Sequence, residues 1–270
     1  MAISLKNLQK RKATLPARIL IYGEPGVGKS SLAASAPNAV FLQVEDGTPG
    51  DLELLSFGKI DTFKDFMSCL QALYEEPHDH KTLVVDSVSE LQRLIFAETC
   101  ERGDEKGNKK NNIEDFGYGK GYVYAQRVMH EIIEGLNLLR SEIGMTIVLI
   151  AHSKIERFDD PESSSYDRYE IDLHAKLVTA LEREMDDILL VKRNVTVKKE
   201  AEGFNKERAI AEGGRHIFIH SEGRPAYVAK SRHEIPDKIK FEKGKGWDAI
   251  APYLPGYEAP KTETKKKDAA

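Results

Sequence analysis

The chain has 270 residues, with 40 Lys and Arg, 44 Asp and Glu, a net charge of −4 and 40% hydrophobic residues. This content supplies enough apolar material for one sizeable core, and the length suits a single large α/β domain with tails or insertions. The slightly acidic balance excludes a globally basic nucleic-acid-binding protein, so any contact with DNA has to come from a local patch.

Cysteine usage and hydropathy favour a soluble protein of a reducing compartment. Cys69 and Cys100 are too few for a disulfide framework or a cysteine-rich metal site. The N-terminus lacks the long apolar stretch of a signal peptide, and the longest apolar runs, such as 147–151, have the length of a strand. We therefore expect reduced cysteines, no membrane contact and a cytoplasmic location.

The apolar pattern predicts alternating strands and helices through the first two thirds of the chain. Expected strands cover 18–22, 39–44, 82–85, 145–151 and 187–191, and expected helices cover 30–35, 62–74, 87–100, 122–143 and 174–183. Two polar segments, 101–121 and 157–169, are expected to be loops. Near the end, 215–220 and 226–230 are expected to form an antiparallel hairpin. The fold class predicted is α/β, a mostly parallel sheet with helices on both faces and an antiparallel C-terminal edge.

A phosphate-binding motif follows the first expected strand. Residues 23–30, Gly-Glu-Pro-Gly-Val-Gly-Lys-Ser, satisfy the P-loop spacing Gly-x-x-x-x-Gly-Lys-Ser/Thr in full, between a strand and a helix. Glycines let backbone N–H groups surround phosphates, while Lys29 can reach the β and γ phosphates and Ser30 can hold Mg²⁺. We predict that ATP and Mg²⁺ bind here, through Gly23, Glu24, Pro25, Gly26, Val27, Gly28, Lys29, Ser30 and Ser31.

Polar residues at the ends of three further strands are candidates for the chemistry. Asp86 ends a buried strand and is predicted to hold Mg²⁺ together with Ser30. Glu45 follows another strand and is the first candidate for orienting the attacking water, with its neighbour Asp46 in reserve. His152 stands where a third strand leaves the sheet, so it is a candidate sensor of the γ-phosphate. Each of them also has a purely structural interpretation, as a strand-end cap or a hydrogen-bonded side chain.

The order of these parts resembles that of the RecA-like P-loop ATPases, in which a P-loop, an acidic residue, a strand ending in Asp-Ser and a polar sensor follow one another. The chain looks most similar to the phage-encoded, Sak-type nucleotide-binding proteins of single-strand annealing and recombination. Residues 116–122, 150–154 and 229–232 carry that likeness, which covers roughly 18–237. It implies a RecA-like ATPase domain, placed at 18–257, between a basic leader at 1–17 and a charged tail at 258–270 that we expect to be disordered.

The resemblance also assigns a role to two cations near the C-terminus. Lys230 and Arg232 alternate on an expected strand, so both side chains point to the same face. In RecA-like hexameric helicases such a Lys-x-Arg reaches the ATP of the neighbouring subunit, where a cationic finger can raise the rate of phosphoryl transfer about 10³–10⁵-fold. The resemblance thus implies a homo-oligomer with ATP at the subunit interface; otherwise both residues are solvated charges.

The two polar segments occupy the places where RecA-like recombinases hold single-stranded DNA. The first, taken as Lys106 to Tyr124, combines lysines that can follow phosphates with rings that can stack on bases. The second, 157–169, is acidic and favours DNA less. The candidate DNA contacts are Lys109, Lys110, Phe116, Tyr118, Lys120 and Tyr122. Single-stranded DNA is thus an expected partner, along with a single-strand binding protein or another recombination protein.

Two other functions fit the motifs. A DNA-independent regulatory or assembly ATPase would use the same segments to bind protein. A small-molecule kinase would need an arginine-bearing lid over the phosphates, for which Arg127, Arg140 or Arg157 are available, although no lid pattern is evident.

Overall fold

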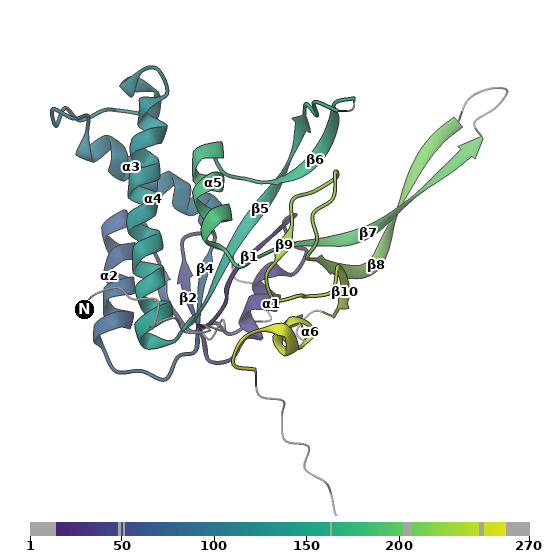
Figure 1. Cartoon of the computed structure of the whole chain (residues 1–270), viewed down its shortest axis with the longest axis horizontal. Coiled ribbons are helices and arrows are strands. Elements are labelled where there is room, and N and C mark those ends of the chain that lie inside the picture. Colours follow the sequence, from purple (N-terminus) through teal and green to yellow (C-terminus); the bar gives the residue numbers. More distant parts are fainter. Residues whose placement is uncertain are drawn as a thin grey trace, which may run out of the picture.

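The computed structural model describes residues 15–47, 50, 52–162, 164–201, 207–242 and 246–257. Most of the predicted basic leader and the whole predicted tail therefore lie outside the described residues. A single sheet runs through the described part in the order β10-β8-β7-β1-β5-β4-β2-β3, with β6 paired to β5 and β9 paired to β7 (Figure 1). The strands are β1 Arg18–Gly23, β2 Ala39–Gln43, β3 Ser56–Lys59, β4 Thr82–Asp86, β5 Thr146–Phe158, β6 Tyr166–Ile171, β7 Asp187–Ala201, β8 Glu207–His220, β9 Lys230–Ser231 and β10 Lys238–Phe241.

The centre of the sheet is parallel and its C-terminal edge is antiparallel. Strands β7, β1, β5, β4, β2 and β3 pair in parallel, whereas β8 pairs antiparallel with both β7 and β10. The central segments are almost continuously apolar because helices cover both of their faces. The predicted α/β fold class is confirmed.

The two faces of the sheet are covered by different numbers of helices. The helices are α1 Lys29–Ala34, α2 Phe63–Glu75, α3 Val88–Arg102, α4 Lys120–Leu138, α5 Ala175–Glu184 and α6 Gly246–Ile250. One core cluster joins one face of the sheet to α2, α3, α4 and α5, and a second joins the other face to α1 and α6 (Figure 1). In α2, buried Phe63, Phe66, Leu70 and Leu73 recur at helical spacing, and the helix begins where Thr62 accepts a hydrogen bond from the N–H of Asp65.

The helix after β4 begins at its own cap, which lies beside the predicted metal ligand. Ser87 directly follows Asp86, and its hydroxyl accepts the N–H of Glu90 at the start of α3. A serine at this position both stops the strand and starts the helix. The short link holds the carboxylate of Asp86 at the edge of the sheet where the parallel strands end.

The second predicted loop, 157–169, is wrong at both ends, because β5 continues to Phe158 and pairs with β6 from Tyr166 onward. Cross-strand contacts hold this hairpin together: the Arg168 guanidinium lies 3.9 Å from the ring centroid of Phe158, which in turn packs on Tyr166. Its polar sequence hid the strands, since both faces of a two-stranded projection are open to solvent.

The predicted hairpin of 215–220 with 226–230 is also wrong. Residues 215–220 belong to β8, whose partner is β7, and the fifth strand extends to Ala201 to make that long pairing. Lys230 and Ser231 instead form β9, which adds to the N-terminal end of β7. The β5–β6 and β7–β8 hairpins and the α3–α4 loop project from the same side of the body (Figure 1).

Candidate active site

Three parallel strands, β1, β4 and β2, end at one edge of the sheet, beside the middle of β5. Gly23 of β1 lies in register with His152 of β5, and Asp86 of β4 lies between Ile150 of β5 and Gln43 of β2. The loop after β1 closes over this edge and forms a pocket of about 300 Å³. The residues that line it are Pro25, Gly26, Gly28, Lys29, Ser30, Ser31, Glu45, Gly47, Asp86 and His152.

Two glycines and one valine shape the phosphate loop. A Cβ on Gly23 would lie 2.1 Å from the carbonyl oxygen of Val191 on β7, so only glycine lets the two strands approach this closely. Gly28 has φ +103°, a conformation that side chains disfavour, at the residue preceding α1. Val27 is buried in the core below the loop. The loop is therefore anchored from beneath, with its outer surface facing the pocket.

Lys29 is the cation of the pocket. It is buried, and its ammonium donates hydrogen bonds to the carbonyl oxygens of Gly23 (2.8 Å) and Glu24 (2.9 Å). Burial lowers the pKa of Lys29, while the nearby carboxylates of Asp86 and Glu45 oppose that shift. The ammonium is thus held within the loop by neutral carbonyl groups, which it can exchange for the oxygens of an anionic phosphate.

Ser30 and Asp86 meet as the motif predicted. The Ser30 hydroxyl, at the start of α1, donates a 2.7 Å hydrogen bond to Oδ2 of Asp86 at the end of β4. Burial raises the pKa of Asp86 above its ordinary value, and the Ser30 hydrogen bond partly offsets this. Mg²⁺ is usually held by one or two carboxylates together with substrate phosphates and water. One hydroxyl and one carboxylate in contact therefore fit a Mg²⁺ ion that arrives with a nucleotide.

Glu45 lines the same pocket as Lys29 and is held by two donors. Both Ser87 Oγ, at 2.8 Å, and His152 Nε2, at 3.1 Å, hydrogen-bond to Oε2 of Glu45. The hydrogen bond from His152 lowers the pKa of Glu45, so the carboxylate is ionised near neutral pH. No described residue donates a hydrogen bond to Oε1. Asp46, the reserve candidate, is exposed and does not line the pocket.

The ring of His152 has one clear tautomer. Its Nδ1 is buried with no hydrogen-bond partner among the described residues, while Nε2 faces the Glu45 carboxylate. The hydrogen therefore belongs on Nε2, since a buried N–H without an acceptor would be costly. The backbone N–H of His152 donates to Ser89 Oγ at 2.9 Å, which ties this point of β5 to α3.

The pocket brings together five side chains that the sequence named for the chemistry and involves two further residues. The five are Lys29, Ser30, Glu45, Asp86 and His152. The predicted loop residues Gly23, Glu24 and Val27 support the loop without lining the pocket. Gly47 and Ser87 were not predicted as site residues. The Asp-Ser sequence at the end of β4 could have indicated that Ser87 lies at the site.

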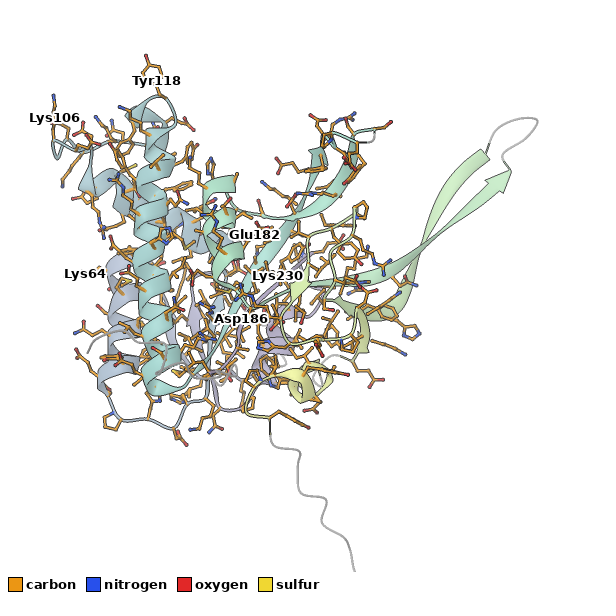
Figure 2. All side chains as sticks on the ribbon, in the orientation of Figure 1. Lys64, Lys106, Tyr118, Glu182, Asp186 and Lys230 are labelled. Atoms are coloured by element: carbon orange, nitrogen blue, oxygen red, sulfur yellow. The ribbon has the colours of Figure 1, made fainter. Side chains whose placement is uncertain are left out.

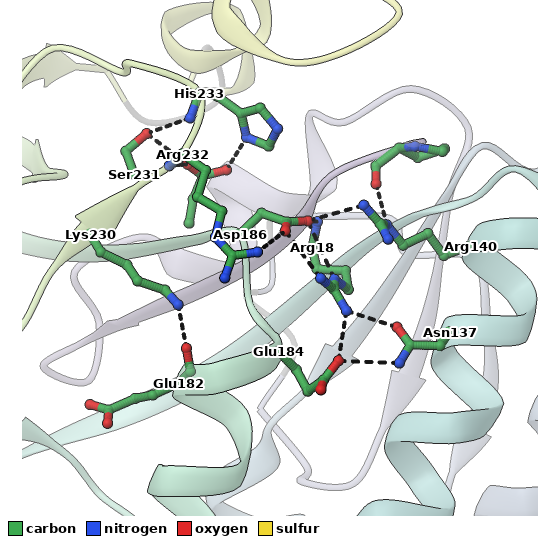
Figure 3. Close-up of polar contacts among 12 residues, drawn as sticks. Arg18, Asn137, Arg140, Glu182, Glu184, Asp186, Lys230, Ser231, Arg232 and His233 are labelled. Carbon is green, nitrogen blue, oxygen red and sulfur yellow. Dashed lines mark hydrogen bonds and ion pairs between the residues drawn. The ribbon is translucent and has the colours of Figure 1, made fainter. Parts of the chain in front are cut away.

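Lys230 and Arg232 lie at the other end of the sheet. Lys230 donates to the carbonyl oxygen of Glu182, and Arg232 Nη1 lies 3.1 Å from Oδ1 of Asp186 (Figure 3). Asp186 also accepts hydrogen bonds from Arg18 and Arg140. Lys230 begins β9 and Arg232 follows its last residue, and within one chain neither of them lines the P-loop pocket. Their role across a subunit interface stays a prediction.

The predicted DNA residues differ in how free they are. Tyr118 is fully exposed at the tip of the α3–α4 loop and, like Lys106, points away from the body (Figure 2). Tyr122 instead stacks on His174 with ring centroids 3.8 Å apart, and Phe116 packs edge-on against Tyr124. Those rings support the loop from within.

The lysines of this loop also differ in their partners. Lys109 pairs with Glu101, and Lys110 lies 3.2 Å from Asp104, so acidic neighbours already offset both charges. Lys120 is exposed at the first position of α4. The arrangement leaves Tyr118 and Lys120 as the more accessible of the predicted contacts, and DNA binding by the loop stays a prediction.

Comparison with known proteins agrees with the geometry of the pocket. The family model described as AAA domain matches residues 15–233. The chain therefore belongs to this AAA family of P-loop ATPases, and that membership implies a nucleotide in the pocket and, in most cases, Mg²⁺ with it. No curated protein matches the chain. Within the described residues, no helix combines the length and the apolar character needed to cross a membrane.

Proposed function

We propose that this protein hydrolyses Mg-ATP and acts on single-stranded DNA as an oligomeric, RecA-like recombination or annealing ATPase of the phage type. The observation that carries the hydrolysis is the position of Glu45. Its ionised carboxylate is held by Ser87 and His152 in the pocket that Lys29 also lines, and no described residue donates to Oε1. A phosphoryl-transfer site needs such an acceptor to orient the attacking water.

Each side chain of the pocket has a separate role in the proposed reaction. A Mg²⁺ ion held at Ser30 and Asp86 would neutralise charge that develops on the phosphate oxygens. Lys29 exchanges its carbonyl partners for the β and γ phosphates. Glu45 orients the water and accepts its hydrogen bond through Oε1, while Ser87 and His152 fix the rotamer of the carboxylate through Oε2.

His152 supports a link between the pocket and a projecting element. The residue belongs to β5, and the same strand continues without interruption into the β5–β6 hairpin. A phosphate that competes for His152 Nε2 would release its hydrogen bond to Glu45 and move this part of β5. The state of the nucleotide would then change the position of a hairpin that projects on the same side as the α3–α4 loop (Figure 1).

The assignment to single-stranded DNA rests on the α3–α4 loop and on the sequence resemblance. The ring of Tyr118 is fully exposed, so no contact within the protein has to break before it can stack on a base. Lys106 and Lys120 are exposed nearby in the chain. Exposed rings beside cations are typical of surfaces that bind single strands with little sequence preference. The positions of two of the three candidate arginines speak against a small-molecule kinase. Arg140 is bound to Asp186 at the far end of the sheet, and Arg127 lies over Tyr124 on α4.

The test is ATP hydrolysis by the purified protein, with and without single-stranded DNA, at low and moderate salt, beside a Lys29→Ala control. Turnover that single strands stimulate, that salt weakens and that the control lacks would support the proposal, because phosphate contacts release counterions. Turnover that requires Lys29 but ignores DNA at both salts would contradict the DNA assignment and favour a protein-directed assembly ATPase. Absence of turnover in the wild type would contradict the proposed hydrolysis.

A further inference from the structure

One cation beside the P-loop is not explained by the site described so far. Val191 of β7 lies in register with Gly23, so the next residues of β7, Lys192 and Arg193, run alongside the phosphate loop. Arg193 is exposed, and its Nη2 lies 3.4 Å from the carbonyl oxygen of Gly26. A hydrogen bond of this length to a neutral acceptor is weak, so the guanidinium can leave it for a stronger partner.

Neighbouring residues on a strand point to opposite faces, and this separates the two cations. Lys192 lies over the rings of Tyr169 and Tyr227, at 5.0 and 5.6 Å from their centroids, on the face that α4 and α5 cover. Arg193 consequently points to the other face, which carries α1 and the outer surface of the P-loop. Of this pair, Arg193 is the one that reaches a residue lining the nucleotide pocket, Gly26.

A β-bulge directly follows Arg193. Arg193 pairs with Ile217 of β8, whereas Val195 pairs with Gly213, so three residues of β8 lie opposite Asn194 alone. A Cβ on Gly214 would lie 2.5 Å from the carbonyl oxygen of Asn194, so the close approach requires glycine. Bulges are common beside active sites, where they redirect a side chain. This irregularity lies at the point where the β7–β8 hairpin passes the P-loop.

The charge of the pocket favours a second cation. Among the residues that line it, Lys29 is the only lysine or arginine, and it faces the carboxylates of Glu45 and Asp86. A nucleoside diphosphate or triphosphate brings further negative charge to the same place. A guanidinium offers five donors in a rigid fork that matches phosphate oxygens, so it can bind them in a bidentate manner.

We propose that Arg193 is a second cationic contact for the bound nucleotide, moving from the Gly26 carbonyl to a phosphate that ADP and ATP have in common. The backbone of the P-loop surrounds the α and β phosphates, and Gly26 belongs to that part of the loop. The inference rests on the proposed nucleotide function of this pocket. It adds a residue that the P-loop motif does not contain and that belongs to β7, more than 160 residues later in the chain.

The experiment measures the binding of Mg-ADP and of Mg-β,γ-imido-ATP by calorimetry to the wild type and to Arg193→Ala, Arg193→Lys and Lys29→Ala. The matched control is Arg183→Ala, which removes an exposed arginine from the last turn of α5, at the opposite end of the sheet. We expect Arg193→Ala to weaken both nucleotides about 10- to 100-fold, as for the loss of a charge-assisted hydrogen bond. Arg193→Lys should recover part of the affinity, and Arg183→Ala should bind like the wild type.

Melting temperatures without nucleotide separate binding from folding. The proposal expects Arg193→Ala to melt with the wild type when nucleotide is absent and to gain less stability when nucleotide is added. Affinity within twofold of the wild type, or lost affinity together with a lowered melting temperature of the free protein, would overturn the role of Arg193. If the wild type binds no nucleotide, the proposed function itself fails; if it binds while Arg193→Ala binds equally well, only this inference fails.

Discussion

Glu45 shows how strongly a residue's neighbours decide its role. The acidic pair 45–46 follows β2, and the sequence left open which of the two orients the water. The structure separates them, because Glu45 receives hydrogen bonds from Ser87 and His152 inside the pocket, whereas Asp46 is exposed. The register in which β2 pairs with β4 explains why Glu45 and Asp46 differ. The N–H of Val44 bonds to the carbonyl of Asp86, and this fixes where the chain leaves the sheet.

We predict that Glu45→Gln binds Mg-ATP normally and hydrolyses it about 100-fold or more slowly. The amide oxygen can still accept the hydrogen bonds of Ser87 and His152, so the pocket keeps its shape while the charged acceptor is lost. Single-turnover hydrolysis and equilibrium nucleotide binding measure the two effects separately. Asp46→Asn is the matched control and should hydrolyse like the wild type. The assignment would be wrong if Asp46→Asn were the slow variant.

His220 makes stability depend on pH. Its ring is 8% exposed, its Nδ1 lies 3.1 Å from the Tyr227 hydroxyl, and burial lowers its pKa to about 4. In the unfolded chain the pKa of His220 returns to about 6.5. At pH values between about 4 and 6.5 the unfolded state therefore binds a proton that the folded state does not bind. This contribution to the free energy of unfolding is present above about pH 6.5 and is lost as the pH falls towards 4. Its size is about 3 kcal/mol.

Urea unfolding at several pH values between 7.5 and 4.5 measures this loss. We predict that His220→Gln, which can still accept the hydrogen bond of Tyr227, loses less stability than the wild type over the range. His216→Gln removes an exposed histidine of the same strand and should follow the wild type. Parallel losses in all three proteins would show that other groups dominate the acid sensitivity.

The strands and helices that pack into the core were predictable from the sequence, whereas the strands of the projecting hairpins were not. The strand ending at Asp86 and the helix beginning at Phe63 appear within one residue of expectation, because burial imposes an apolar pattern on them. The β5–β6 hairpin shows no such pattern, since solvent covers both faces of its paired strands. Arg193 was overlooked for a related reason: its function depends on which strand lies beside β1, and the P-loop motif does not encode that pairing.

The α3–α4 loop can be tested as an element through its fully exposed ring. We predict that Tyr118→Ala weakens the binding of a labelled single-stranded oligonucleotide about 5- to 150-fold, corresponding to one base stack of about 1–3 kcal/mol. Fluorescence anisotropy measures the affinity, and thermal unfolding should show no change because the ring buries no surface. Tyr253→Ala, which removes a partly exposed ring near α6, is the control. Equal affinities for the two variants would exclude Tyr118 from DNA binding.

At the scale of the whole molecule, the sheet itself separates two groups of charged residues. The backbone N–H of Arg232 bonds to the carbonyl of Asp186, whose own N–H bonds to the carbonyl of Arg18. Arg232 is therefore located at the beginning of β1, whereas the P-loop follows its end. The strand's six residues span about 17 Å at 3.3 Å per residue, farther than an arginine side chain reaches. Any ATP that Arg232 contacts must belong to another subunit.

A head-to-tail assembly would bring the beginning of one sheet to the P-loop edge of the next, as in rings and filaments. In such an oligomer we predict that Arg232→Ala lowers turnover about 10³-fold or more. Its fold should survive, because Arg18 and Arg140 still bind Asp186. Arg224→Ala is the matched control, since Arg224 is equally exposed and is also paired with an aspartate.

Mixing two inactive variants gives the decisive measurement. Lys29→Ala cannot use its own ATP but keeps Arg232, whereas Arg232→Ala keeps an intact P-loop. If the arginine acts between subunits, a mixture of the two regains turnover that neither variant has alone, and light scattering confirms the mixed oligomer. If Arg232→Ala instead turns over ATP like the wild type in a confirmed oligomer, Arg232 serves only to anchor β9 beside β7.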